Sequence, residues 1–184
     1  MDGYKNLQKW TSIRTANIVS LHTVFTIKAF GDQSIMFVYD FHPAAETLMQ
    51  RHFMQGFYNK KRQQRKLTSS DSTIKNLSEN QINEPLIWTY IVQLTAALRA
   101  LHSKDLAYRQ MYPTNILISG KSRYEKFQTF EMLNFFRLRL NYPAVSDILS
   151  GNAEELLRYQ QEDLIHLGRV SFIFVIFGPN FTVS

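Results

Sequence analysis

The sequence predicts an α+β fold, and three observations carry that prediction. Two β-prone segments, 17–30 and 34–41, flank a turn signal at 31–33, which favours an antiparallel pair of strands. A long helix is predicted over Glu84–Lys104, with Pro85 in its first turn. A short strand follows at Ile116–Ile118. The apolar positions of the helix recur every three or four residues and predict one buried face: Ile87, Ile91, Leu94, Leu98 and Leu101.

The other elements are less sharply marked. Weak helical spacing covers residues 1–15, and helix-forming residues after Pro43 predict a short helix over Ala44–Phe53. The polar segment 57–83 is predicted to be a long inserted loop. The aromatic-rich segment 124–140 gives no clear secondary structure, and a last helix is predicted over about 160–174.

Composition bounds the class of protein. The chain has 184 residues, of which 45% are hydrophobic, enough for one ordinary core. It contains no cysteine, which excludes a disulfide scaffold and thiolate zinc sites. We expect no signal peptide and no membrane partner, because the longest apolar run, 172–177, is far shorter than the roughly 20 residues that span a bilayer.

The net charge of +6 comes almost entirely from one short run of basic residues. Two interpretations of this run stay open. It forms either a solvated surface loop or a contact with the phosphate backbone of a nucleic acid. The basic residues of this run are Lys60, Lys61, Arg62, Arg65 and Lys66.

The segment Leu101–Ser119 resembles the catalytic loop of protein kinases. Tyr108-Arg109-Gln110 stand where the kinase pattern has His-Arg-Asp, and Pro113 and Asn115 match the residues that follow. Further on, Asp163–Gly168 resembles the start of the next conserved kinase helix. The resemblance implies a protein kinase-like fold with part of the N-lobe sheet and part of the helical C-lobe.

The same resemblance implies that the chain is no enzyme. Gln110 has no titratable group with which to accept the proton of a substrate hydroxyl, as the kinase aspartate does. The metal-binding Asp-Phe-Gly is expected about ten to fifteen residues after Asn115, where residues 127–131 read Phe-Gln-Thr-Phe-Glu and no aspartate occurs from 124 to 136. A glycine-rich phosphate loop and the usual lysine are missing as well. Two alternatives remain: a degenerate but active kinase, and an RNA-binding module that uses residues 60–66.

The resemblance is closer to one family, the pseudokinase domains of regulatory subunit 3 of poly(A)-nuclease deadenylation complexes. Four segments carry it: 19–53, 86–102, 114–123 and 159–170. It divides the chain into a partial N-lobe and hinge (1–43), a short helix (44–56), a basic and polar insertion (57–84) and a partial C-lobe (85–184). On this reading the chain is a fragment of a longer protein.

Membership of this family implies a regulatory function. The chain would be a non-catalytic scaffold that recruits and stimulates the poly(A) nuclease catalytic subunit during mRNA poly(A) tail shortening and decay. The implied partners are that nuclease subunit, the poly(A)-binding protein and, in full-length relatives, a second copy of the same subunit. Weak contact with poly(A) RNA is a further expectation. The implied location is the cytoplasm, in P-bodies.

The family binds ATP without hydrolysing it, so ATP is the implied cofactor, and no metal site is predicted. The alternative is a kinase-type hinge with no ligand. Hinge backbone groups can pair with an adenine edge, and threonine and asparagine can hydrogen-bond ribose or phosphate. Carried onto matching positions, the binding residues are Asp40, Phe41, His42, Pro43, Ala44, Ala45, Glu46, Thr47, Thr114 and Asn115.

Structural roles are predicted for the remaining residues of the motif. Arg109 is expected to stabilise the loop through backbone or carboxylate contacts, and Asp163 to accept hydrogen bonds from the loop backbone. Tyr108 is expected to pack in the core, as are the aromatic residues at 127, 130, 135 and 136. The apolar side chains at 170 and 172–177 are expected to lack cover, which predicts poor solubility.

Overall fold

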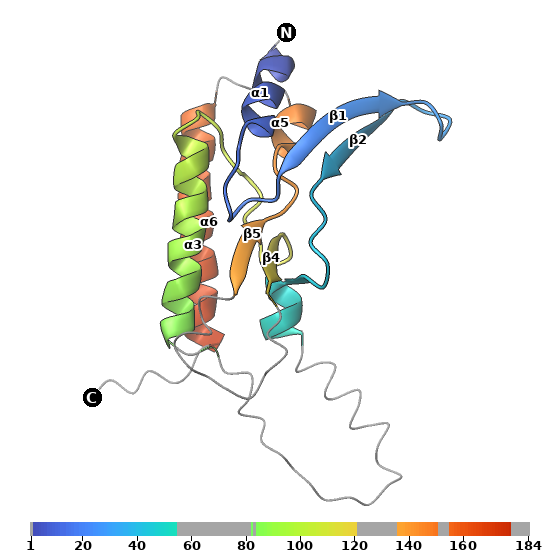
Figure 1. The fold of residues 1–184 in the computed structure, drawn as a ribbon. Coiled ribbons are helices and arrows are strands. Elements are labelled where there is room, and N and C mark those ends of the chain that lie inside the picture. Colours follow the sequence, from blue (N-terminus) through green and yellow to red (C-terminus); the bar gives the residue numbers. More distant parts are fainter. Residues whose placement is uncertain (1, 55–81, 83, 121–135, 151–154, 178–184) are drawn as a thin grey trace, which may run out of the picture.

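The computed structural model describes residues 2–54, 82, 84–120, 136–150 and 155–177 (Figure 1). The basic run at 60–66 and the segment 127–131 therefore lie outside the described residues. In chain order the elements are α1 (Asp2–Thr11), β1 (Leu21–Ile27), β2 (Ser34–Tyr39), β3 (Glu46–Thr47), η1 (Met49–Phe53, a short π-helix), α3 (Glu84–His102), β4 (Ile116–Ser119), β5 (Arg137–Leu140), α5 (Val145–Ser150) and α6 (Leu156–Phe177).

The predicted antiparallel pair is confirmed as the hairpin β1–β2, in which Ile27 pairs with Ser34 across the turn. Gly31 supplies the positive φ of 84° that this turn requires. The first strand begins at Leu21 rather than at residue 17, because the chain before it pairs elsewhere. Val19 N donates to Leu140 O at 3.0 Å, and Leu140 N donates to Asn17 O at 2.9 Å.

A second sheet has the strand order β3-β4-β5, antiparallel throughout. The predicted helix over 44–53 is wrong in its first half, because Glu46 and Thr47 pair with Ile118 and Leu117 as β3. Ladder hydrogen bonds here outweigh the helix propensity of the local sequence. Thr47 and Gln50 then close a reciprocal cap, with Thr47 N donating to Gln50 Oε1 at 2.9 Å and Gln50 N to Thr47 Oγ1 at 3.1 Å.

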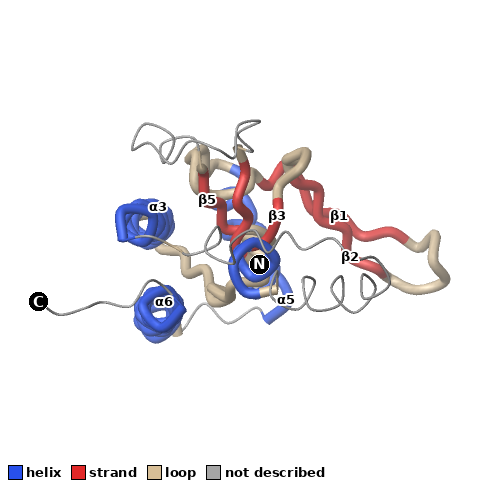
Figure 2. The backbone as a smooth tube through the Cα atoms, turned by 90° about the horizontal axis from the view of Figure 1, so that it is seen from below, coloured by secondary structure: helices blue, strands red, loops and turns tan. Residues whose placement is uncertain are grey.

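The long helices α3 and α6 lie side by side, with the sheet β3-β4-β5 next to them and the hairpin on the far side (Figures 1 and 2). Helix α3 confirms the prediction and ends at His102. The chain leaves the helix through Asp105, whose φ of 54° lets Leu106 N donate to Leu101 O at 3.1 Å. Helix α6 begins four residues before the predicted start at 160 and ends three after 174. None of the helices in the described part of the chain is both long and apolar enough to cross a bilayer.

One core joins these elements. The predicted stripe of α3 is buried except for Ile91, which is half-buried. The inner faces of β4 and β5 complete this core, together with the indole of Trp10 from α1. The segment that forms β5 had no predicted secondary structure. The strand residues that pack inward are Ile116, Ile118, Leu138 and Leu140.

The expectation for the end of α6 is partly wrong. Val170 and Phe174 are 2% and 0% exposed, and the Phe174 ring packs 5.6 Å from the ring of Tyr90 on α3. Only part of the helix surface is therefore open. Its exposed apolar side chains include Phe172, Val175 and Ile176.

The imidazole of His52 on η1 makes the stability of this fold depend on pH. Its Nε2 lies 3.1 Å from Tyr90 Oη, and burial, reinforced by the charge of Arg51, lowers its pKa from 6.5 to about 4. Between these values the unfolded chain binds a proton that the folded chain excludes, so stability falls as the pH falls. We expect the free energy of unfolding to drop by about 3 kcal/mol from pH 7 to pH 4.

Urea unfolding at a series of pH values measures this drop. His52→Gln keeps a hydrogen-bonding group opposite Tyr90 and removes the titration, so the variant should lose most of the pH dependence below 6.5. An undiminished slope in the variant would show that other groups control the acid sensitivity.

Candidate functional site

The loop between α3 and β4 is anchored from below by one carboxylate on α6. Asp163 is fully buried, and it accepts hydrogen bonds from Tyr108 N at 2.7 Å and from Arg109 N at 2.6 Å. His102 Nε2 lies 3.0 Å from the same carboxylate. These bonds hold Arg109 at a φ of 65°, which few residues other than glycine adopt. The predicted role of Asp163 is confirmed.

Arg109 ties the loop to α5. Its Nη1 lies 3.6 Å from Asp147 Oδ1, and its guanidinium stacks 3.7 Å from the ring centre of Tyr159. Trp10 Nε1 on α1 donates to the other oxygen of Asp147 at 3.0 Å. Burial raises the pKa of Asp147, although these two contacts oppose the rise. The predicted carboxylate contact of Arg109 is confirmed, and the loop is connected through Asp147 to α1.

Tyr108, Gln110 and Asn115 form the inner part of this loop. Tyr108 is buried as predicted, and its Oη lies 2.6 Å from Asn141 O and 3.1 Å from Asn115 O, either of which can accept its hydrogen bond. Gln110 Nε2 donates to Ser146 Oγ at 2.7 Å, and Asn115 Nδ2 donates to Gln110 O at 3.3 Å. The carboxamide of Gln110 is thus held by α5.

The structure also places the end of β5 beside this loop, which the sequence did not suggest. Asn141 N donates to Asn115 O at 2.9 Å. Asn141, the residue that follows β5 at this place, carries an amide rather than a carboxylate. Within the described ranges, no group of three or more His, Asp or Glu side chains is arranged to hold a metal ion.

The predicted hinge segment, 40–47, connects β2 to β3 and passes beside β4 (Figure 1). At its start Asp40 Oδ1 lies 2.6 Å from His22 Nε2. Hydrogen bonds lower the pKa of Asp40, the larger effect coming from Ser20 and the smaller from His22. Phe41 is 86% exposed. His42 Nε2 is buried, and among the described residues it finds no hydrogen-bond partner. Pro43 and Ala44 are exposed, and Ala45 N donates to His42 O at 3.3 Å.

The far end of the hinge meets the loop. Thr47 pairs with Leu117, Glu46 with Ile118, and Met49 N donates to Pro113 O at 3.0 Å. Thr114 follows Pro113, is exposed and donates through Oγ1 to Asn115 Oδ1 at 3.3 Å. Of the predicted binding residues, the structure therefore pairs 46–47 with 117–118 of β4, the strand that begins directly after 114–115. Among the described contacts none joins Asp40 or Phe41 to the loop.

The outer face of the sheet carries a residue that the sequence analysis missed, Arg139. The register places Leu117 opposite Arg139, so both project from the same face, which also carries Ser119. Arg139 Nη1 donates to Ser119 Oγ. Burial lowers the pKa of Arg139, and the positive charge of Arg137 lowers it further, whereas the negative charge of Asp40 raises it. The alternation Arg-Leu-Arg-Leu at 137–140 was the available signal.

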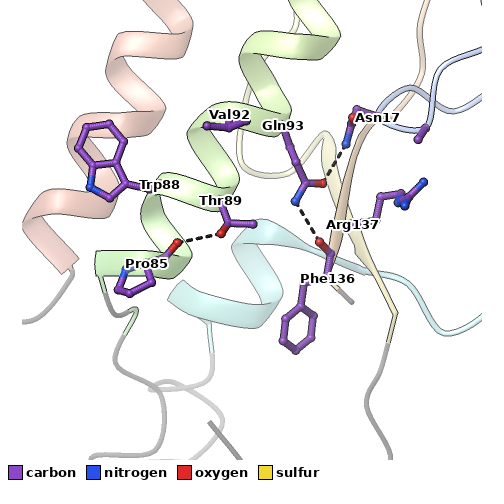
Figure 3. Close-up of a pocket in the computed structure, with 9 residues that line it drawn as sticks. Asn17, Pro85, Trp88, Thr89, Val92, Gln93, Phe136 and Arg137 are labelled. Atoms are coloured by element: carbon purple, nitrogen blue, oxygen red, sulfur yellow. Dashed lines mark hydrogen bonds between the residues drawn. The ribbon is translucent and has the colours of Figure 1, made fainter. Parts of the chain in front are cut away.

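A separate pocket of about 630 Å³ lies between α3 and the start of β5 (Figure 3). Its wall is organised by Gln93, which accepts from Asn17 Nδ2 and from Leu138 N at 2.9 Å and donates to Phe136 O at 3.0 Å. None of the predicted binding residues lines it. The lining residues are Ala16, Asn17, Pro85, Trp88, Thr89, Val92, Gln93, Phe136 and Arg137.

A hairpin, a hinge, a long helix and a loop anchored to the following helix define a kinase-like fold. No family model matches the chain. It is 40% identical over 167 residues to the PAN2-PAN3 deadenylation complex subunit pan3 of Xenopus tropicalis, which covers 88% of this chain and 19% of that protein. The structure of the Drosophila melanogaster PAN3 pseudokinase matches with a TM-score of 0.69 and 29% identity, covering 96% of this chain and 40% of that one.

A complex of Neurospora crassa PAN2 (WD40-CS1) with PAN3 (pseudokinase and C-term) matches with a TM-score of 0.66 and 30% identity, over 97% of this chain and 37% of that one. The chain is therefore homologous to the PAN3 pseudokinases, and the predicted kinase-like fold is confirmed. It spans about a fifth of the length of the curated relatives it matches.

Proposed function

We propose that this chain is the pseudokinase region of a non-catalytic regulatory subunit of a PAN2-PAN3-type deadenylation complex. It would act in poly(A) tail shortening by recruiting and stimulating the nuclease subunit. The observation that carries the proposal is the likeness, over almost the whole chain, to PAN3 solved in complex with PAN2. Contacts with the poly(A)-binding protein and with a second copy are proposed for the longer protein, as is a cytoplasmic location in P-bodies.

Co-purification with the WD40-CS1 region of PAN2 tests the proposal, followed by a deadenylation assay on a poly(A)-tailed RNA. The expected results are a shared peak in size-exclusion chromatography and faster shortening of the tail. Separate elution together with an unchanged rate would contradict the proposed role. The basic run at 60–66 is tested in the same assay. If it contacts RNA, neutralising it weakens binding for all sequences alike and flattens the salt dependence.

We also propose that the chain transfers no phosphate. Gln110 stands where a kinase has its catalytic aspartate, and its amide is hydrogen-bonded to Ser146, so it cannot act as a general base. Asn141, rather than an acid, lies beside Asn115.

The expected result is no phosphate incorporation above background with radiolabelled ATP, for the chain itself or a generic protein substrate. Gln110→Asp should not change this, because the acidic metal ligand would still be missing. Incorporation that disappears in an Asn115→Ala variant would establish activity and overturn the proposal.

Nucleotide binding without catalysis is proposed for the hinge and the loop. The exposed ring of Phe41 offers an aromatic face, and the unpartnered Nε2 of His42 offers a polar atom to a ligand. Thr114 and Asn115 add a hydroxyl and an amide at the other end of the segment. These groups suit the nucleoside part of ATP, but they supply no positive charge for the phosphates of ATP. When bound, ATP would serve as a structural ligand of this region.

A further inference from the structure

We propose that Arg139 binds the phosphate of the nucleotide, so that this site takes the free nucleotide rather than its magnesium complex. The inference rests on the nucleotide-binding proposal above and adds the residue and the chemical form of the ligand.

The first support is the position of the side chain. Arg139 projects from the outer face of β5, opposite Leu117 of β4, and Leu117 in turn pairs with Thr47 of the hinge. The guanidinium donates to Ser119 Oγ on the same face. Arg139 therefore stands on the sheet face beneath the segment that carries the candidate nucleotide-binding residues.

The second support is the unbalanced charge of the side chain. Arg139 is half-buried, yet among the described residues it forms no ion pair with a carboxylate. The neighbouring carboxylate, Asp40, is engaged by His22 at 2.6 Å. A guanidinium that is partly removed from water favours an anionic partner, and the four remaining N–H donors of this one suit phosphate oxygens.

The third support is the orphaned nitrogen of His42 in the same neighbourhood. Burial and then the charge of Arg139 lower the pKa of His42, so the two side chains share one electrostatic environment. A neutral imidazole with a buried, unpartnered Nε2 is costly unless a ligand completes its hydrogen bond. A ligand that is anionic and carries polar groups satisfies both residues.

The chemical form of the ligand follows from what surrounds Asn115. A magnesium ion bound to nucleotide is usually held by protein carboxylates, and Asn115 and its neighbour Asn141 are both amides. A guanidinium can neutralise phosphate charge directly and bind two oxygens at once. Arg139 would thus replace the metal, and adding magnesium would not strengthen binding.

The test compares ATP with adenosine by isothermal titration calorimetry on the whole chain, in EDTA and in excess magnesium. Arg139→Gln is expected to weaken the binding of ATP about tenfold or more and that of adenosine less than about twofold. This is the size of effect expected for the loss of one hydrogen-bonded charge. Arg137→Gln removes the same charge two residues earlier on the same face, where the side chain is exposed, and should change both affinities less than about twofold. Wild-type affinity for ATP should be no higher in magnesium.

Arg139→Lys keeps the charge without the planar fork, so it should weaken the binding of ATP several-fold and leave the binding of adenosine unchanged. This variant keeps the test valid even if the glutamine variant fails to fold. Equal losses for ATP and adenosine, equal effects at 137 and 139, a requirement for magnesium, or no ATP binding by the wild-type chain would each overturn the inference. Binding to PAN2 is measured separately, so these outcomes are distinct from a failure of the proposed scaffold role.

Discussion

Asp163→Ala is expected to lower the free energy of unfolding by about 3–5 kcal/mol, because it removes a buried charged acceptor that has three partners. The backbone N–H of Tyr108 would lose its acceptor in a buried place, and that of Arg109 in a partly buried one. His102 would lose its partner as well. The loop is also held at the positive φ of Arg109, which it would be free to relax. Denaturant unfolding followed by circular dichroism measures the loss.

The neighbouring acid gives a matched control. Glu162 lies on the same helix turn, is half-exposed and pairs only with Arg158 at the surface. Glu162→Ala should therefore cost less than about 1 kcal/mol. Asp163→Asn keeps one carbonyl oxygen as an acceptor and should fall between the two. If Asp163→Ala and Glu162→Ala proved equally mild, the carboxylate would not be what holds the loop.

The roles of Asp163, Arg109 and Tyr108 could be predicted because a linear motif records them. Here a loop that follows the buried helix α3 is held by a buried acceptor on α6, a cation and a packed ring, each at a fixed position of the motif. Periodicity similarly located α3 and the hairpin β1–β2, since each depends on contacts within or between adjacent segments. In these cases local sequence and tertiary packing favour the same structure.

The residues that sequence reasoning missed are those placed by non-local pairing. Glu46 and Thr47 have good helix-forming neighbours, and only the partner strand β4, some 70 residues later in the chain, makes them a strand. The positions of Arg139 and Asn141 likewise depend on the register of β4 with β5, across a segment whose length no motif fixes. The position of Arg139 on the outer face of the sheet and the amide beside Asn115 were therefore visible only in three dimensions.

Pairing also explains how the hinge, the loop and α1 can respond to one another. The hinge is joined to the loop through Met49 and Pro113, and the loop is joined to α1 through Arg109 and Asp147. A ligand seated on Arg139 would contact the sheet to which both belong.

Phe174→Ala on α6 is expected to lower the free energy of unfolding by about 3–5 kcal/mol, the usual cost of emptying a fully buried aromatic site. The ring is 0% exposed, and its centre lies 5.6 Å from that of Tyr90 on α3, which in turn contacts His52 on η1. The cavity would therefore open at the junction of the two long helices, where the surrounding side chains are held by their own contacts. Thermal and urea unfolding of the whole chain measure the effect.

Phe172 is the matched control, since it lies two residues earlier on the same helix and is 64% exposed. Phe172→Ala should change the free energy of unfolding by less than about 0.5 kcal/mol and should reduce self-association, because it removes an exposed ring. Phe174→Leu leaves a smaller cavity and should cost less than Phe174→Ala. Equal losses of stability for the alanine variants at 172 and 174 would mean that the end of α6 is not packed against α3 in solution. The expectation from the sequence, that these side chains lack cover, would then be correct.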